Sequence, residues 1–256
     1  MKYVDLDFFH VAFLILGGLI AGFINVLAGS GSFITLPVMI FLGIPAPIAN
    51  GTNRIAVFFQ NMVSARSFYT NRLLPLKQAL WLSLPSVAGS LIGAWIAVDI
   101  NKKMMETAIG IIMLIMLAFM FYKPEKWLKS HKTEKASVPD LKWWHFMLLF
   151  FIGIYGGFIQ AGVGVFLLVG LVLGINYDMV RANAIKAFIN LVFTPFALIV
   201  FILSNQVDYV SGFILTAGSV TGAYIATRTA IRWGAVYIRW IVVAVIVFSS
   251  VKLLFF

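Results

Sequence analysis

Long apolar runs separated by short polar connections extend through nearly the whole chain. Most of these runs are close to the ~20 residues that a helix needs to cross a hydrocarbon core about 30 Å thick. Two shorter runs, 33–44 and 165–175, are typical of re-entrant or interrupted segments. The predicted segments are 8–28, 33–44, 46–65, 76–98, 104–122, 143–160, 165–175, 179–203, 208–227 and 235–256. This pattern predicts an all-α integral membrane protein with a single membrane domain over residues 1–256.

The two halves of the chain resemble each other, and a polar linker over residues 123–142 separates them. Similar short motifs recur in the same order in both halves, which indicates an internal duplication. The matches are Gly22-Phe-Ile-Asn25 with Gly157-Phe-Ile-Gln160, Gly29-Ser-Gly31 with Gly162-Val-Gly164, and Ala49-Asn50 with Ala182-Asn183. We therefore expect a first repeat over 1–122 and a second over 143–256, each with about five helical segments.

The distribution of positive charge predicts how the repeats are oriented. The chain is 62% hydrophobic and only 11% charged, and its formal net charge is +10. Lys and Arg lie mainly in short connections, as in the cytoplasmic loops of membrane proteins, so the expected partner is a lipid bilayer rather than nucleic acid. An odd number of crossings in each half places most cations on one side. The prediction is thus a multi-pass protein of the cell inner (cytoplasmic) membrane with inverted repeats and a cytoplasmic linker. No feature indicates an oligomeric state.

Glycine-rich breaks precede the two short runs, at Ala28-Gly-Ser-Gly-Ser32 and Ala161-Gly-Val-Gly164. Matching interruptions in two repeats point to a binding site in many transporters. We expect broken or re-entrant helices at 28–33 and 161–165, where a new helix begins with free N–H groups and a positive dipole end. The alternative is that these glycines only allow close helix packing.

Arg54 and Lys186 each lie about eight residues into an apolar run, which corresponds to a depth of ~12 Å. A charge at that depth normally faces the protein interior and has a partner. All nine acidic residues lie in connections or near run ends, so a bound small anion is the predicted partner. Alternatively, either side chain reaches an interface, or pairs with Asp178 or with backbone carbonyls. The predicted substrate-binding residues are Asn25, Gly29, Ser30, Gly31, Ser32, Asn50, Asn53, Arg54, Gln160, Gly162, Gly164, Asn183, Lys186 and Asn190.

The sequence gives little support for catalysis or for a cofactor. Cysteine is absent, which excludes disulfides and thiolate chemistry. The histidines His10, His131 and His145 lie near run ends, so we expect no catalytic residue, no metal, no cofactor and no dedicated proton relay. An intramembrane enzyme is therefore disfavoured, whereas a non-transporting membrane scaffold or insertion factor stays an alternative. For an anion transporter, facilitated electrogenic export is the expected mode.

The chain also resembles a known family over nearly its whole length. The residues concerned are Gly22-Phe-Ile-Asn-Val-Leu-Ala-Gly-Ser-Gly-Ser32, Leu36-Pro37, Gly43-Ile-Pro45 and Ala49-Asn-Gly-Thr-Asn53, with weaker copies after Gly157. They are similar to the sulfite exporter TauE/SafE family of permeases. The resemblance implies a secondary transporter that moves sulfite, a sulfonate or a related organosulfur anion, as an exporter.

Overall fold

In a computed structural model that describes residues 7–121 and 141–229, every regular element is a helix. The helices are α1 (Phe8–Ala28), α2 (Ser32–Phe41), α3 (Ala46–Thr70), α4 (Leu76–Val98), α5 (Lys102–Phe121), α7 (Trp143–Phe158), α8 (Val163–Val169), the π-helix η1 (Gly170–Gly174), α9 (Met179–Leu203) and α10 (Tyr209–Thr229). The predicted segment 235–256 and nearly all of the 123–142 linker lie outside the described residues.

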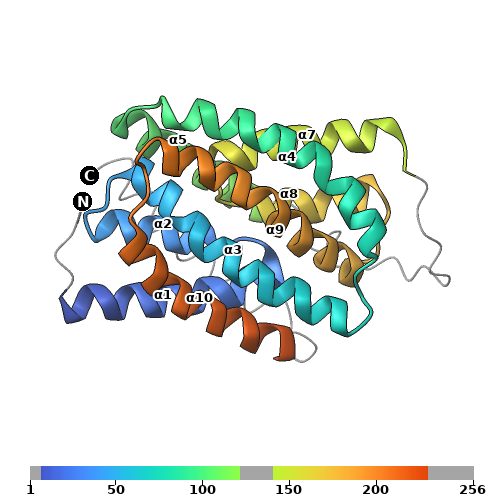
Figure 1. The fold of residues 1–256 in the computed structure, drawn as a ribbon, viewed down its shortest axis with the longest axis horizontal. Helices are drawn as coiled ribbons and strands as arrows, with labels where there is room; N and C mark the ends of the chain where they lie inside the picture. The colour runs from blue at the N-terminus through green and yellow to red at the C-terminus, as the bar shows by residue number, and fades with distance from the viewer. Residues whose placement is uncertain (1–6, 122–140, 230–256) are drawn as a thin grey trace.

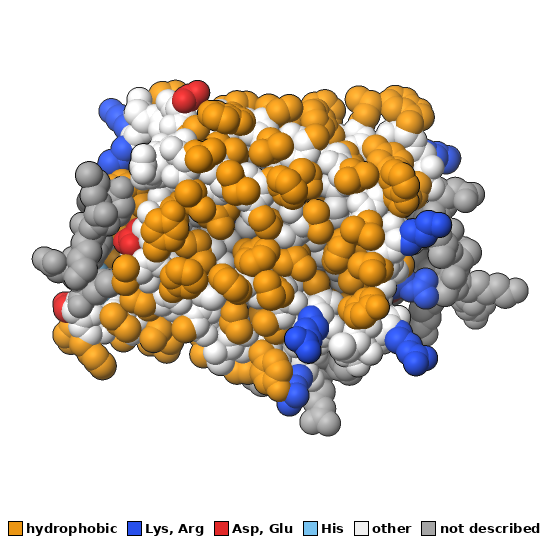
Figure 2. Space-filling view, viewed as in Figure 1, with side chains coloured by type: hydrophobic (Ala, Val, Ile, Leu, Met, Phe, Trp, Pro, Cys, Tyr) orange, Lys and Arg blue, Asp and Glu red, His pale blue; other side chains and the backbone are white. Residues whose placement is uncertain are grey.

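Apolar side chains cover the outside of the helix bundle, which confirms an all-α membrane protein. The helices α1, α4, α9 and α10 are long and apolar enough to cross a membrane. Large hydrophobic side chains such as Phe13, Trp81 and Ile199 are more than half exposed. Hydrophobic side chains form the broad orange band across the face shown in Figure 2. A surface of this kind is stable in lipid and would be a liability in water.

The ends of the bundle carry the charged side chains. In Figure 2, Lys and Arg gather mainly toward the right-hand end, where Figure 1 places the end of α3 and the starts of α4 and α9. Asp7 begins α1 as its N-cap, and a hydrogen bond from the backbone N–H of His10 lowers the pKa of its carboxyl group. The side of the membrane that each end faces stays a prediction.

The helices of the two halves correspond in order, with α1, α2, α3 and α4 matching α7, α8 with η1, α9 and α10. Figure 1 shows α1 running from left to right and α7 from right to left. The first element of each half packs against the fourth element of the other, so α1 contacts α10 and α7 contacts α4. An inverted arrangement within a membrane stays a prediction, because no membrane defines the sides.

Glycines allow close contact within the two helix pairs α1–α10 and α4–α7. A Cβ atom on Gly93 would lie 1.9 Å from the Ile154 carbonyl oxygen, and one on Gly222 would lie 2.0 Å from that of Leu19. Close backbone contact at a glycine therefore recurs at the α4–α7 and the α1–α10 interfaces, and small residues commonly allow such contact between membrane helices. These two matching interfaces join the two halves.

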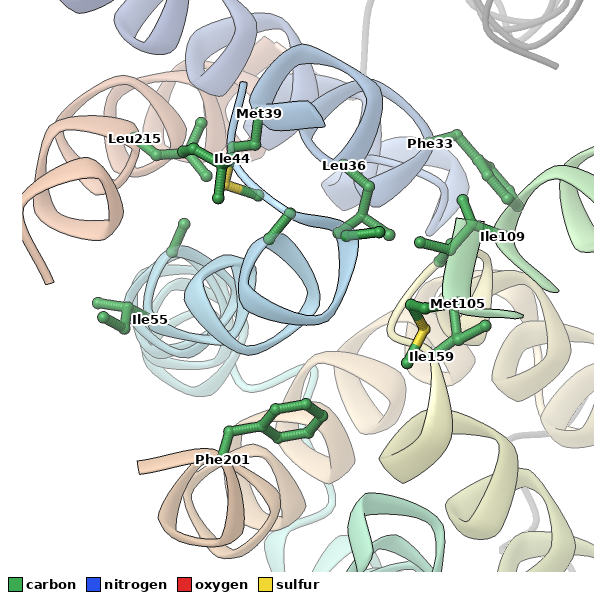
Figure 3. Packing of buried hydrophobic residues seen from close by; sticks show 14 of the residues in the cluster. Phe33, Leu36, Met39, Ile44, Ile55, Met105, Ile109, Ile159, Phe201 and Leu215 are labelled. Carbon is green, nitrogen blue, oxygen red and sulfur yellow. The ribbon is translucent and has the colours of Figure 1, made fainter. Parts of the chain in front are cut away.

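The helices α3 and α9 pack against each other and carry the buried polar side chains. Apolar residues from both halves surround them in one cluster. In Figure 3, Phe33 of α2 lies near Ile109 of α5, and Met105 of α5 lies near Ile159, which follows α7. Phe201 of α9 lies below α3 in the same view. Apolar residues of both halves therefore pack around the polar site.

Candidate functional site at two broken helices

Both predicted helix breaks are present. Helix α1 ends at Ala28, Gly29 has a φ of 72°, and α2 begins at Ser32. Helix α7 ends at Phe158, Gly162 has a φ of 74°, and α8 begins at Val163. The second break therefore begins before the predicted 161–165 segment, and Gly164 belongs to the first turn of α8. A positive φ of this size favours glycine because a Cβ atom strains it.

The two breaks meet in space. A Cβ atom on Gly29 would lie 2.4 Å from the carbonyl carbon of Gly164, and one on Gly164 would lie 2.5 Å from the Cα atom of Gly29. Real Cβ contacts are never so short, so only glycine at both positions allows this approach. Residues more than a hundred positions apart thus form one central junction between the halves.

Arg54 of α3 holds the carboxyl end of α7. Its side chain is 0% exposed, and Nη1 donates to the Gly156 carbonyl and to Gln160 Oε1, each at 3.0 Å. The Nη2 atom donates to the Gly157 carbonyl at 2.6 Å, and the guanidinium lies 4.5 Å from the centre of the Phe201 ring. The last carbonyls of a helix lack partners within it and carry its negative dipole end, so a cation there is stabilising.

Asn50 completes this arrangement one turn before Arg54. Its Nδ2 atom donates to the Phe158 carbonyl at 2.8 Å, and its Oδ1 accepts from the Gln160 backbone N–H at 3.4 Å. The predicted residues Asn50, Arg54 and Gln160 therefore lie together at the second break. Asn50 and Arg54 thereby cap a helix of the opposite half.

Lys186 of α9 holds the carboxyl end of α1 in the same way. Its side chain is 1% exposed, and Nζ donates to the carbonyls of Asn25 at 3.0 Å and Val26 at 3.3 Å. Asn183 Nδ2 also donates to the Val26 carbonyl, at 2.9 Å. Each half thus supplies an asparagine and a cation that cap the broken helix of the other half.

These contacts decide between the alternatives for the two cations. Both side chains are buried, so neither reaches an interface. Asp178 caps the start of α9 and lies 3.6 Å from Arg181 rather than from Lys186. Among the described residues, no carboxylate forms an ion pair with Arg54 or Lys186. Their hydrogen-bond partners are backbone carbonyls and, for Arg54, also Gln160 Oε1. Binding of an anion stays a prediction.

Hydroxyl groups line the first break. Asn53 Nδ2 donates to Ser32 Oγ at 2.9 Å, and Thr35 Oγ1 donates to Asn53 Oδ1 at 2.6 Å. Ser30 Oγ is buried and has no hydrogen-bond partner. The Gly31 N–H donates to Asn25 Oδ1 at 3.4 Å, which braces the break itself.

The expectation of free backbone amides in the new helices is wrong for several positions. At the first break, the amides of Phe33 and Ile34 donate to the carbonyls of Ser30 and Gly31. At the second break, the amides of Val165 and Phe166 donate to the Gly162 carbonyl. Because these tight turns use several of the amides locally, side-chain donors have to supply part of the contacts to a ligand.

Several buried polar atoms on α3 and α9 lack partners. They include Arg54 Nε, Asn183 Oδ1, Asn190 Oδ1 and Thr194 Oγ1. Asn190 and Thr194 lie one helical turn apart on the face of α9 that also carries Lys186, as helical spacing predicts. Buried polar groups without partners are uncommon in proteins and mark places where a ligand or water binds.

Three further residues support the site, although they were not among the predicted binding residues. Thr194 adds an unpartnered hydroxyl, Phe201 packs under Arg54, and the Tyr155 hydroxyl donates to the Ala161 carbonyl at 2.5 Å. Thr194 shares a helix face with Lys186, which its spacing indicates. For Phe201 and Tyr155 no sequence signal exists, because apolar positions of this kind recur along the whole chain.

Comparisons with known proteins agree with these features. The sulfite exporter TauE/SafE family matches residues 14–253. The chain is 29% identical to the probable membrane transporter protein ORF9 of Sinorhizobium sp over 98% of this chain and 94% of that protein. It is 28% identical to a probable membrane transporter protein of Haemophilus influenzae, over 98% and 97%. It is 23% identical to the probable membrane transporter protein YfcA of Escherichia coli K12, over 96% and 92%.

No solved structure matches the chain. The family match covers most of the chain and includes both broken helices. Apolar helices of membrane-spanning length and the names of the relatives agree with it. The chain therefore belongs to the sulfite exporter TauE/SafE family and is a multi-pass membrane transporter.

Proposed function

We propose that the protein is a secondary transporter that moves a small sulfur-containing anion, such as sulfite or a sulfonate, across the cytoplasmic membrane as an exporter. The observation that carries this proposal is the meeting of two broken helices beside two buried cations. Arg54 and Lys186 have no carboxylate partner among the described residues. The family and the relatives' names support transport, and the charge of the site supports an anion.

The charge balance of the site favours an anionic ligand. Each helix carboxyl end supplies a partial charge of roughly −0.5, so the ends of α1 and α7 offset roughly half of two full positive charges. An excess of roughly +1 is left before the positive end of α2 is counted. A charge deep in a membrane costs at least about 2.5–3.5 kcal/mol, so one singly charged anion would offset much of this penalty.

Access to this site requires a change of conformation. Asn50, Asn53 and Arg54 are fully buried, and Ser30 and Lys186 are nearly so. In transporters with broken helices, one part of the bundle rocks against the other and exposes a central site alternately to each side. The junction between Gly29 and Gly164 lies where such movement would separate the two halves.

Export follows from the sign of the substrate and of the membrane potential. An inside-negative potential drives an anion outward with about 2.3 kcal/mol per charge per 100 mV. Among the described residues, Arg54 and Lys186 are the fully buried charged side chains on α3 and α9, and no acidic residue lies within either helix. Outward movement of a cytoplasmic anion therefore needs no coupled proton.

Flux of labelled sulfite and ethanesulfonate from proteoliposomes would test the proposal. We expect outward flux that increases with an inside-negative potential set by potassium and valinomycin. Arg54→Gln and Lys186→Met should each reduce flux about tenfold or more, equivalent to about 1.4 kcal/mol. Arg66→Gln and Lys77→Met are matched controls at exposed positions and should leave flux unchanged. Absence of flux for every anion, with folded protein present, would instead favour a membrane scaffold or insertion factor.

A further inference from the structure

The two breaks differ as ligand sites, although each contains a glycine with a positive φ. We propose, on the basis of the proposed function, that the α1–α2 break alone binds the oxygen atoms of the substrate anion, through the hydroxyl groups of Ser30 and Ser32. Asn53 is the positioning residue for Ser32. The α7–α8 break completes the enclosure but contributes no hydroxyl group of its own.

Ser30 provides the first donor. It lies between Gly29, which has a positive φ, and the start of α2, and its side chain is 2% exposed. Its Oγ atom has no hydrogen-bond partner. A buried hydroxyl group without a partner is an exception among proteins and needs an explanation. A ligand oxygen at the start of α2 explains it, because the positive end of a ten-residue helix also favours an anion there.

Ser32 provides the second donor because its neighbours orient it. Asn53 uses its Oδ1 to accept from Thr35 and its Nδ2 to donate to Ser32. Ser32 Oγ therefore acts as an acceptor in this chain of hydrogen bonds, and its own proton stays available. Thr35, by contrast, donates its hydroxyl proton to Asn53. The hydroxyl proton of Ser32 is therefore the one in this network that can be donated to a ligand.

The second break lacks both donors at the matching positions. Gly29-Ser30-Gly31-Ser32 corresponds to Gly162-Val163-Gly164-Val165. Val163 is buried in an apolar cluster with Leu167 and Phe193 instead of facing polar groups. The helix that follows is also only seven residues long before it becomes the π-helix η1. The second break therefore offers an apolar wall where the first offers hydroxyl groups.

The two cations also differ in which break they contact. Lys186 caps the α1 end at Asn25 and Val26, a few residues before Ser30, so its charge belongs to the first break. Arg54 directs both terminal nitrogens at the second break. We therefore expect selectivity for anions with several oxygen acceptors, such as sulfite and ethanesulfonate, over chloride, because two hydroxyl donors can bind two oxygens of one group.

Kinetics of matched variants would test this division. Ser30→Ala and Ser32→Ala should each raise the KM for labelled ethanesulfonate about tenfold and reduce the preference over chloride. The thermal unfolding midpoint should stay unchanged for Ser30→Ala, because Ser30 has no partner to lose. It should fall for Ser32→Ala, because Asn53 Nδ2 loses its acceptor. Ser30→Thr should restore the KM. The matched variants Val163→Ala and Val165→Ala should leave the KM unchanged and lower the unfolding midpoint instead.

Asn53 needs a separate test because it acts through Ser32. Asn53→Ala should raise the KM about as much as Ser32→Ala does. The double variant should be no worse than either single variant, because the two residues act as one unit. Additive effects would show that Asn53 does not act through Ser32.

Substrate protection gives a second measurement, since the chain has no cysteine. The variants Ser30→Cys and Val163→Cys would each be labelled with a methanethiosulfonate reagent during transport. Ethanesulfonate should slow labelling at position 30 and not at position 163. Equal protection at both positions, or an unchanged KM in Ser30→Ala and Ser32→Ala, would overturn the division. If the unmodified protein moved no anion at all, the proposed function itself would fail, which is a distinguishable outcome.

Discussion

At both the α1–α2 break and the α7–α8 break, a cation and an asparagine of the other half cap the helix end, but the number of contacts differs. Arg54 makes three hydrogen bonds at the end of α7, contacts the Phe201 ring, and is joined by Asn50. Lys186 makes two hydrogen bonds at the end of α1 and is joined by Asn183. Because the planar guanidinium presents fixed donors and an ammonium does not, we expect the second break to be the more rigid of the two.

The short helices that follow the breaks also differ. Pro37 interrupts the backbone hydrogen bonds of α2, whereas at the same offset from the break the second half begins the π-helix η1 at Gly170. A proline removes a donor, and a π-turn shifts the hydrogen-bond register. Two different residues thus weaken the same point of both short helices. The comparison suggests that both repeats have a weakened point in the short helix, whereas they differ in the side chains that they offer to a ligand.

The largest expected effect comes from the contact between the breaks. Gly29→Ala and Gly164→Ala should each prevent assembly of the central junction, since the new Cβ would lie within 2.4–2.5 Å of backbone atoms that cannot move aside. Gly29→Ala should be worse, because its φ of 72° adds strain. Recovery of monodisperse protein by size-exclusion chromatography is the measurement.

Gly17→Ala is the matched control for these variants. Its Cβ would meet the Val38 side chain at 3.2 Å, and a side chain can adjust by the small distance required. This variant should be recovered in normal yield. Normal yield and normal flux for Gly164→Ala would show that the breaks do not touch in the folded protein.

The next effect distinguishes the two cations. Arg54→Met leaves the carbonyls of Gly156 and Gly157 without their side-chain donor, at about 1–3 kcal/mol for each. Lys186→Met should cost much less, because the Val26 carbonyl keeps Asn183 and the Asn25 carbonyl keeps the Gly29 N–H. The thermal unfolding midpoint in detergent should therefore fall clearly for Arg54→Met and little for Lys186→Met. Equal decreases would contradict the inequality between the breaks.

Much of this site could be predicted from sequence because it depends on local signals. The Gly-Ser-Gly motif indicated the first break, and the position of Arg54 and Lys186 within their runs indicated burial. Helical spacing placed Asn50 beside Arg54 and Asn190 beside Lys186. These inferences hold because the period of a helix and the thickness of a bilayer are fixed by physics.

The partners of the cations could not be predicted in the same way. Arg54 and Gly156 are separated by 102 residues, and spacing along a helix says which side chains share a face but not which helix lies opposite. A carbonyl cap also leaves no mark in the sequence, since every residue has a carbonyl. The end of α7 was misplaced for a related reason, because Gly156-Gly-Phe-Ile159 is uniformly compatible with an apolar helix.

A smaller effect separates the two asparagines. Asn50→Ala removes the side-chain donor to the Phe158 carbonyl and the acceptor for the Gln160 N–H, so it should cost about 1–3 kcal/mol. Asn183→Ala should cost about 1 kcal/mol or less, because Lys186 still donates to Val26. Chemical denaturation in mixed micelles can measure the difference. A larger loss for Asn183→Ala would reverse the ranking of the two breaks.

The smallest change in stability is expected where the short helices are weakened. Pro37→Ala restores a backbone donor within α2 but removes buried ring carbons, and these effects of about 1–3 kcal/mol oppose each other. Gly170→Ala is also mild, because its Cβ would meet the flexible end of Leu148 at 3.2 Å. The unfolding midpoint should therefore move little in either variant. If these points act as hinges, flux should nevertheless fall in both, and an unchanged flux would show that the short helices move as rigid units.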